Sequence, residues 1–344
     1  MRKLLAASSA LVLCAFAAAP VQAEDDYPAW AYGFTSAPAP GTPPAAPNPP
    51  QKLDNVTLHS IPGSKFQFTR AQIANRYAPA DWFPEDHPGM PPVVEHGKEA
   101  AQPTVYACSL CHYPNGKGRP ENANVTGLSY EYIVQQLMDF RGGHRKTTDP
   151  RKGNTGLMAN FAKSMTDDEI KEAAKYFTAI SASNGTTPWI KVVEAATVPK
   201  TKAQGGMFLT LEGAEAGSEP IGNRIIETPL SAHDTEFLRN PRSGFVAYVP
   251  PGSLKKGEAL VTGGTTASGS KVTACTVCHG PSLQGLGPVP TLAGRSPSYL
   301  VRQLYDMRHG SRTGAWTPLM TPIVASLGTD DMLNAAAYLT SLHP

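Results

Sequence analysis

The sequence predicts a helical protein built from two related halves. A five-residue motif occurs twice, as Cys108-Ser-Leu-Cys-His112 and Cys275-Thr-Val-Cys-His279, and the residues that follow each copy repeat as well. The segments 132–141 and 299–308 match at an offset of 167 residues and place apolar side chains at helical spacing. A chain of 344 residues with 41% hydrophobic content is long enough for two or three modest domains with buried cores.

Each half has the same predicted order of elements: the motif, a Gly/Pro loop, an amphipathic helix, a loop with a methionine, and a final helix. The final helices have clear start signals, because Thr166-Asp-Asp-Glu169 and Thr329-Asp-Asp331 each offer a capping residue and acids in the first turn. Before the final helix the offset drops from 167 to 162, so that Met158 matches Met320. The sequence therefore predicts that both methionines lie in loops.

The repeated motif has the spacing at which haem c is attached to a protein. Two cysteines separated by two residues reach the two vinyl groups of the porphyrin, and the histidine that follows falls beneath the ring, where its imidazole can ligate iron. We therefore predict two covalently bound haem c groups, on Cys108 and Cys111 and on Cys275 and Cys278, with His112 and His279 as iron ligands.

Other uses of paired cysteines fit the sequence less well. A disulfide framework has no need of the following histidine, and a zinc site would need a second pair of ligands converging on one metal. A thioredoxin-like redox motif would open a helix after a strand, whereas here Gly- and Pro-rich segments follow both motifs.

The order of these elements resembles that of class I cytochromes c, and the tandem arrangement resembles the di-haem c-four type. The residues that carry the resemblance are the two motifs, Met158 and Met320, and the final helices at 166–177 and 329–341. The resemblance covers about 95–182 and 253–344. It implies an all-α fold of two small domains in tandem, each around one haem. The long segment between these domains and the Pro-rich extension before them depart from the c-four pattern.

Methionine and histidine compete for the sixth position on each iron. Of the nine methionines, only Met158 and Met320 are methionine in both halves, and both lie outside the predicted helices. Met165 is equivalent to Leu327, which cannot bind iron. His144, His309 and His96 remain the alternative ligands. We predict His/Met pairs, which favour Fe(II) and leave no open iron position.

Three further expectations concern the surroundings of the haems. Arg141/Arg308 and Arg145/Arg312 either pair with haem propionates or are solvated cations at helix ends. The resemblance to class I cytochromes c implies that Pro290 presents its carbonyl to the N–H of His279, with Pro120 as a looser candidate in the first half. The proline-braced segment at Met320 and the polar 146–156 segment before Met158 predict that the second haem is better shielded and has the higher potential.

The remaining segments suggest export and a wrapped arrangement. Residues 1–23 have the charged start, short apolar run and small-residue cleavage site of a Sec-type signal peptide, and Cys14 should leave with it. We divide the rest into an extension (24–94), cytochrome domain 1 (95–182), a connecting segment (183–252) and domain 2 (253–344). We expect the extension and the connecting segment to be irregular, with strand-like stretches at 207–211 and 244–249. Apolar residues in 183–252 favour packing against both domains over an extended spacer.

Together these features predict a periplasmic electron carrier without enzymatic activity of its own. It would pass single electrons between a dehydrogenase or respiratory donor and a terminal acceptor, with redox proteins as partners. Charge is nearly balanced, with 30 Lys and Arg against 28 Asp and Glu, which disfavours nucleic-acid binding. No apolar run in the mature chain is long enough to span a membrane, and peripheral association stays open. The alternatives are an obligate subunit of a periplasmic dehydrogenase complex and a di-haem redox enzyme.

Overall fold

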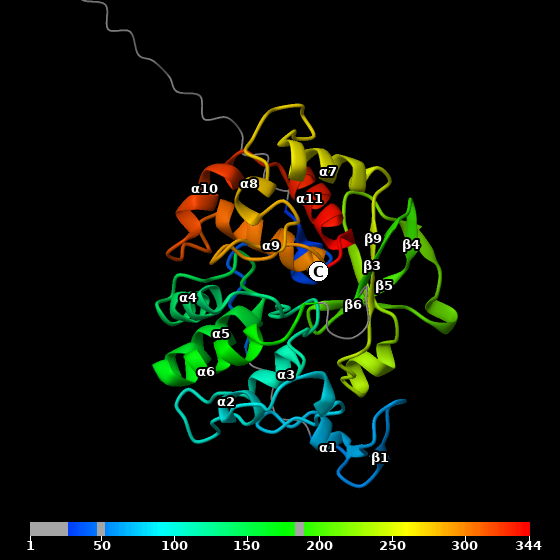
Figure 1. The fold of residues 1–344 in the computed structure, drawn as a ribbon. Helices are drawn as coiled ribbons and strands as arrows, with labels where there is room; N and C mark the ends of the chain where they lie inside the picture. Colours follow the sequence, from blue (N-terminus) through cyan, green and yellow to red (C-terminus); the bar gives the residue numbers. More distant parts are fainter. Residues whose placement is uncertain (1–26, 47–51, 183–188) are drawn as a thin grey trace, which may run out of the picture.

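A computed structural model describes residues 27–46, 52–182 and 189–344 (Figure 1). The predicted signal peptide, including Cys14, lies outside the described residues. Among the helices of the described part, none is both long and apolar enough to cross a membrane.

The first half contains four helices. They are α3 (Cys108–His112), α4 (Tyr130–Arg141), α5 (Gly153–Ser164) and α6 (Asp167–Thr178). Of these, α4 and α6 match the two predicted after the motif. Helix α6 begins as predicted, because the Thr166 side chain accepts a hydrogen bond from the Glu169 amide while Glu169 accepts one from the Thr166 amide. Apolar residues from α4, α5 and α6 form one core, including Leu137, Phe161 and Phe177.

The second half repeats these helices and adds one before the motif. Its helices are α7 (Ser253–Gly263), α8 (Thr276–His279), α9 (Pro297–Arg308), α10 (Thr317–Ala325) and α11 (Thr329–Ser341). Helix α11 starts at Thr329 rather than being capped by it, and Asp331 accepts a hydrogen bond from the Gly328 amide instead. The helices of both repeats fall within the ranges 95–182 and 253–344.

The loops predicted around the two methionines are helices, which corrects that expectation. Met158 lies inside α5 and Met320 inside α10. Gly153 and Gly156 weaken α5 and Pro322 interrupts α10, and these residues are the reason for the loop prediction. Burial of Phe161 and Ala162 from α5 and of Val324 from α10 offsets that weak propensity.

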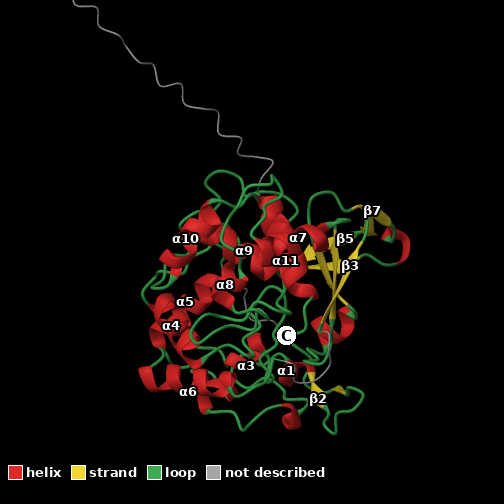
Figure 2. Ribbon diagram, turned by 45° about the horizontal axis from the view of Figure 1, so that its top comes forward, coloured by secondary structure: helices red, strands yellow, loops and turns green. Residues whose placement is uncertain are grey.

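The connecting segment, expected to be irregular, forms a layer of short strands. A three-stranded sheet pairs β3 (Ile190–Glu194) in parallel with β9 (Phe245–Val249), and β9 antiparallel with β8 (Ile226–Pro229). The other strands form two antiparallel pairs, β4 (Thr197–Pro199) with β7 (Ser218–Pro220) and β5 (Thr201–Gln204) with β6 (Met207–Thr210). The strands β6 and β9 confirm the two stretches predicted as strand-like. Figure 2 shows these strands along one edge and the repeat helices gathered on the other side.

The sheet layer belongs to the core of the second half. Phe245, Ala247 and Val249 alternate toward one buried face of β9 and pack in a cluster that includes residues of α9 and α11. The N-terminal turn η1 (Ala29–Tyr32) is buried in the same cluster. Tyr32 is fully buried, and its hydroxyl donates to Asp306 Oδ1 of α9 at 2.7 Å.

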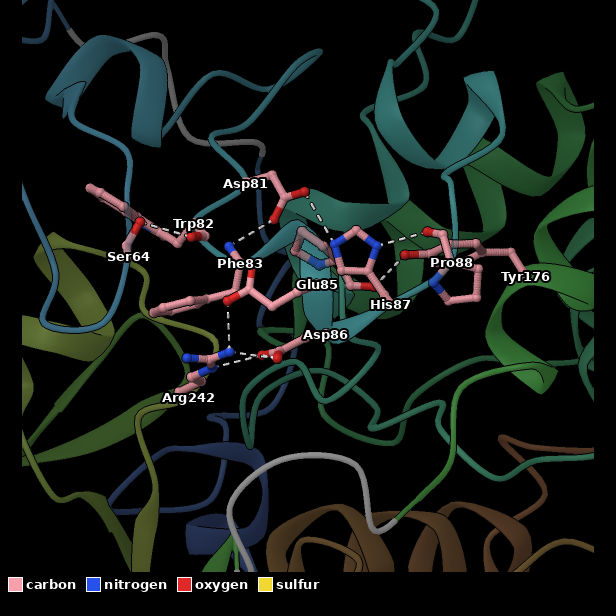
Figure 3. Close-up of polar contacts among 11 residues, drawn as sticks. Ser64, Asp81, Trp82, Phe83, Glu85, Asp86, His87, Pro88, Tyr176 and Arg242 are labelled. Atoms are coloured by element: carbon pink, nitrogen blue, oxygen red, sulfur yellow. Dashed lines mark hydrogen bonds and ion pairs between the residues drawn. The ribbon is translucent and has the colours of Figure 1, made fainter.

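The rest of the extension covers the first half. Its elements are β1 (Leu58–His59), β2 (Phe68–Thr69), α1 (Arg70–Ile73), η2 (Pro84–Asp86) and α2 (Pro92–Glu95). Trp82 and Phe83 form a third core with Leu238 of the connecting segment. Figure 3 shows Arg242 reaching across to Glu85 and Asp86, with 2.6 Å from its Nη2 to Asp86 Oδ1.

The same close-up shows how the extension lies against α6. His87 contacts Asp81 Oδ2 through Nε2 at 3.1 Å and the carbonyl of Pro88 through Nδ1 at 2.9 Å (Figure 3). Its ring packs edge-on against the ring of Tyr176 of α6, with 6.1 Å between the ring centroids. The extension is therefore anchored both to the first half and to the connecting segment.

The two halves meet through equivalent residues. Arg145 Nη2 donates to Gln303 Oε1 at 2.7 Å, and Arg312 Nη2 donates to the equivalent Gln136 at 2.9 Å. The backbones of Arg145 and Arg312 pair as an antiparallel bridge. Reciprocal contacts of this kind are those of a two-fold interface, here between repeats of one chain.

Candidate haem-binding sites

The first motif forms one turn of helix that points its side chains into a cavity. Cys108, Cys111 and His112 line this cavity together with Met158. His112 Nδ1 lies 2.8 Å from the carbonyl oxygen of Ala123. A proton on Nδ1 would donate to that carbonyl and leave Nε2 free for a metal.

The second motif repeats this geometry. His279 is buried, and its Nδ1 lies 2.8 Å from the carbonyl oxygen of Pro290, as expected. Ala123 and Pro290 each follow their histidine by eleven residues. Pro120 was the wrong candidate in the first half, because its carbonyl accepts a hydrogen bond from Arg302 of α9 instead.

The protonation of these groups suits haem attachment better than thiolate chemistry. Burial lowers the pKa of both His112 and His279, which keeps the imidazoles neutral as metal ligation requires. Burial raises the pKa of Cys108 to about 12 and that of Cys275 to about 11, so neither thiol is an activated thiolate. All four cysteines of the described chain are free of disulfides, and no cluster of three His, Cys, Asp or Glu residues is found there.

Two methionines border the first cavity. Met158 and Met165 both line it, and Met165 is the more buried of the two. Met165 ends α5, and its backbone carbonyl accepts a hydrogen bond from Arg141 Nη2 at 2.8 Å. Only Met158 has a methionine partner, Met320, in the repeat.

The first cavity has the composition that a haem needs. Apolar side chains from three helices line most of it, including Leu137, Phe161 and Phe177. One buried ammonium, Lys152 Nζ, reaches the cavity without a hydrogen-bond partner in the described part of the chain. A flat apolar macrocycle that carries carboxylates fits such a lining.

The second half contributes part of this cavity wall, which the sequence did not predict. Tyr299, Arg302 and Gln303 of α9 line the first cavity. The repeat indicates part of this wall, because Tyr299 and Gln303 are equivalent to Tyr132 and Gln136 of α4. Arg302 departs from the repeat, since its equivalent is Gln135.

The repeated arginines are not equivalent: Arg308 is exposed in the last turn of α9, as a solvated helix-end cation would be, whereas the other three contact residues elsewhere in the chain. Arg145 lines the first cavity and contacts α9, which leaves propionate pairing open for it. Arg312 instead reaches Tyr132 and Gln136 across the interface. Arg141 forms an ion pair with Asp167 at 2.6 Å and donates to the carbonyl of Ala162, so it joins α4 to α5 and α6.

The exposure of the residues around the two sites does not support the predicted difference in shielding. The 146–156 segment is held in the interface, where Asp149 is fully buried and Lys152 is 5% exposed. Around the second motif, by contrast, Val277 is 68% exposed and Leu319, next to Met320, is 74% exposed. These exposures therefore give no support for a higher potential of the second haem, which stays a prediction.

No family model matches the chain, but known proteins do. Cytochrome c4 of Pseudomonas aeruginosa is 24% identical over 248 residues, which cover 71% of this chain and 88% of that protein. Cytochrome c-554(548) of Halomonas halodenitrificans is 39% identical over 80 residues, covering 23% of this chain and 96% of that protein. The cytochrome subunit of sulfide dehydrogenase from Chlorobaculum tepidum is 32% identical over 101 residues, covering 29% and 82%.

Proposed function

The chain belongs to the c-type cytochromes and is an electron-transfer protein of the di-haem c4 kind with two covalently bound haem c groups; from this we propose how its residues hold them. Cys108 and Cys111 carry the first haem and Cys275 and Cys278 the second. His112 and Met158 ligate the first iron, and His279 and Met320 the second. The observation that supports this assignment is the repeated contact of each motif histidine with a carbonyl oxygen at 2.8 Å.

Each haem supplies a one-electron Fe(III)/Fe(II) couple when bound. The chain's own residues orient the imidazoles, exclude water from the first site and join the two sites across one interface. We place the protein in the periplasm on the strength of the predicted signal peptide. With a histidine and a methionine on each iron, no position is left for a substrate, which supports a carrier and not an enzyme.

The carrier would act as a free protein between a donor dehydrogenase and an acceptor. A dehydrogenase subunit is the second candidate, favoured by the similarity to the sulfide dehydrogenase cytochrome subunit. The extension and connecting segment bury Trp82, Phe83 and Phe245, each 1% exposed, inside this chain, but they also leave large apolar side chains exposed: Val56, Leu58, Phe66 and Leu230. The buried residues favour a free carrier, while the exposed ones are apolar surface of the kind a partner covers, so the two candidates need an experiment to separate them. Size-exclusion of a native periplasmic extract separates the two, because only a subunit elutes with a larger complex.

Replacement of each proposed methionine tests the ligand assignment. In Met158→Ala and Met320→Ala we expect each protein to lose about half of the weak far-red absorption band that iron–sulfur(Met) bonding gives in the oxidised state. Met165→Ala is the matched control, since Met165 borders the same cavity, and should retain the whole band. Loss of the band in Met165→Ala with retention in Met158→Ala would reassign the ligand.

A further inference from the structure

An excess of positive charge borders the first cavity. Lys152, Arg145 and Arg302 line it, while Glu121 is the carboxylate on its wall. Glu121 is already paired with Arg119 at 2.5 Å. The cavity wall therefore has cations that its own acid does not neutralise.

Lys152 is the least compensated of these cations. Its side chain is 5% exposed, and Nζ has no hydrogen-bond partner within the described residues. Burial, and next the like charge of Arg302, lower its pKa well below the ordinary range, although Glu121 and Asp149 act in the opposite direction. The nearby Asp149 is paired with Arg151 at 2.7 Å. A buried ammonium without a partner is costly, so Nζ keeps its charge in the native protein only beside an anion.

Arg302 brings a second cation to the same wall from the other half of the chain. Its guanidinium donates to two neutral acceptors, the carbonyls of Ala31 at 2.5 Å and Pro120 at 2.8 Å. These bonds fix the side chain, and no carboxylate of the described residues forms an ion pair with it, although burial lowers its pKa and Asp306 and Glu227 lie near enough to act in the opposite direction. Arg145 is likewise bonded to the neutral amide of Gln303.

We propose that Lys152 binds a propionate of the first haem, with Arg302 of the second half as a further cation facing these carboxylates. The proposal rests on the proposed function, which places the haem in this cavity. A propionate is an anion that its covalent attachment delivers to the cavity, and a charge-assisted hydrogen bond to it would satisfy Nζ. The first haem would then be bound to both halves of the chain.

The repeat indicates that this arrangement is confined to the first haem. Twelve residues separate Arg145 from Met158, but only seven separate Arg312 from Met320, and the shorter stretch contains no Lys or Arg. Lys152 therefore lies in a stretch that is five residues longer than its counterpart, and it has no basic equivalent at the second site. Because a nearby cation favours the less positive Fe(II) state, Lys152 should raise the potential of the first haem and make it the higher of the two.

The test is the midpoint potential of each haem in Lys152→Met, which removes the charge at nearly constant volume. Each wave of the redox titration is assigned to one haem by repeating the titration in the double variant Lys152→Met/Met158→His. We expect the Fe(III)/Fe(II) ratio of the first haem at fixed ambient potential to rise about tenfold, equal to about 59 mV for a one-electron couple, with the second haem unchanged. Lys163→Met is the matched control, because Lys163 is exposed on the same α5.

The outcomes separate this inference from the proposed function. If the native protein carries no first haem, the proposed function fails. If both haems are present and Lys152→Met leaves the first potential unchanged, the propionate contact is wrong. A purely structural lysine would alter stability without moving a potential. Should Lys152→Met lose haem, Lys152→Gln is the second variant. If that also fails, a slowly exchanging, ring-current-shifted lysine Nζ signal in the reduced native protein supports the contact, and its absence overturns it.

Discussion

Glu227 is a buried acid near the junction of the sheet and α9. It is 2% exposed, and one carboxylate oxygen accepts a hydrogen bond from Ser296, the residue that caps α9, while the other has no partner in the described chain. Burial is the main cause that raises its pKa to about 7, while Ser296, Ser298 and Arg302 act in the opposite direction. Near neutral pH this carboxyl is therefore about half protonated, unlike an ordinary glutamate.

Stability should fall as Glu227 ionises. Its pKa in the folded protein, about 7, is above the ordinary 4.5. The stabilisation is fully present below about pH 4.5 and is lost as pH rises through 7, with a total of about 3 kcal/mol. Glu227→Gln should thus increase the free energy of unfolding at pH 8 and change it little at pH 4. Denaturant titrations at both pH values measure this, with exposed Glu172→Gln as the control. Equal effects at both pH values would contradict the ionisation argument.

The role of a residue could be predicted where a short sequence pattern is typical of one role. The motif spacing selected both histidines, and Pro290 was found because it lies close along the chain to the residue it contacts. Pro120 was the wrong choice because a proline indicates a turn but not which carbonyl of that turn contacts the imidazole. In the first half the carbonyl of Ala123 contacts His112. Lys152 and Arg302 could not be predicted, since their roles depend on contacts between halves that lie far apart in sequence.

At the scale of elements, the two halves differ most before the motif. In the second half, α7 packs closely on α11, and Gly257 makes this approach feasible because an added Cβ would lie 2.0 Å from the carbonyl oxygen of Asn334. At the 167-residue offset the first half has Met90 among Pro88, Pro91 and Pro92, which prevent a long helix. There the four-residue α2 and the folded extension take the place of that helix.

Gly257→Ala should destabilise the second half. The methyl group would force α7 away from α11, at a cost of about 1–3 kcal/mol or more. Gly263→Ala is the matched control in the same helix, because no atom lies within 4 Å of its added Cβ, and it should be neutral or slightly stabilising. Thermal unfolding followed at the haem absorption and in the far-ultraviolet measures both. A similar midpoint for the two variants would show that α7 is free to move.

Helices with caps and a clear apolar face could be predicted, whereas helices without them could not. Helices α4 and α6 could be predicted because Ser129 and Thr166 cap their first turns and because their apolar residues recur at helical spacing. α5 and α10 have no side-chain cap and contain Gly or Pro, so only their packing keeps them helical. The parallel pairing of β3 with β9 is equally invisible in the sequence, because about fifty residues separate the two strands.

For the whole molecule, the connecting segment determines how the halves are held. It shares a core with the second half and reaches the first through Glu236, which pairs with Arg119, and through Pro241, whose carbonyl accepts a hydrogen bond from Asn115. The wrapped arrangement expected from its apolar composition therefore holds. The sheet that produces it was visible only as two strand-like stretches.

The last prediction is that electrons move between the two haems inside one molecule. The first cavity is walled partly by α9, and Arg312 ties the halves together through Tyr132 and Gln136. After flash reduction we expect the haems to equilibrate at a rate independent of protein concentration. Small-angle scattering should show one compact particle.

Arg312→Gln should slow this equilibration, because it removes three hydrogen bonds across and beside the interface and leaves buried partners unpaired. Lys255→Gln, an exposed change on α7, is the control and should leave the rate unchanged. The flash-reduction traces are compared at several protein concentrations, because a rate that rises with concentration indicates transfer between molecules. A concentration-dependent rate in the native protein, together with a two-lobed scattering profile, would mean that the two haems act as separate carriers joined by one chain.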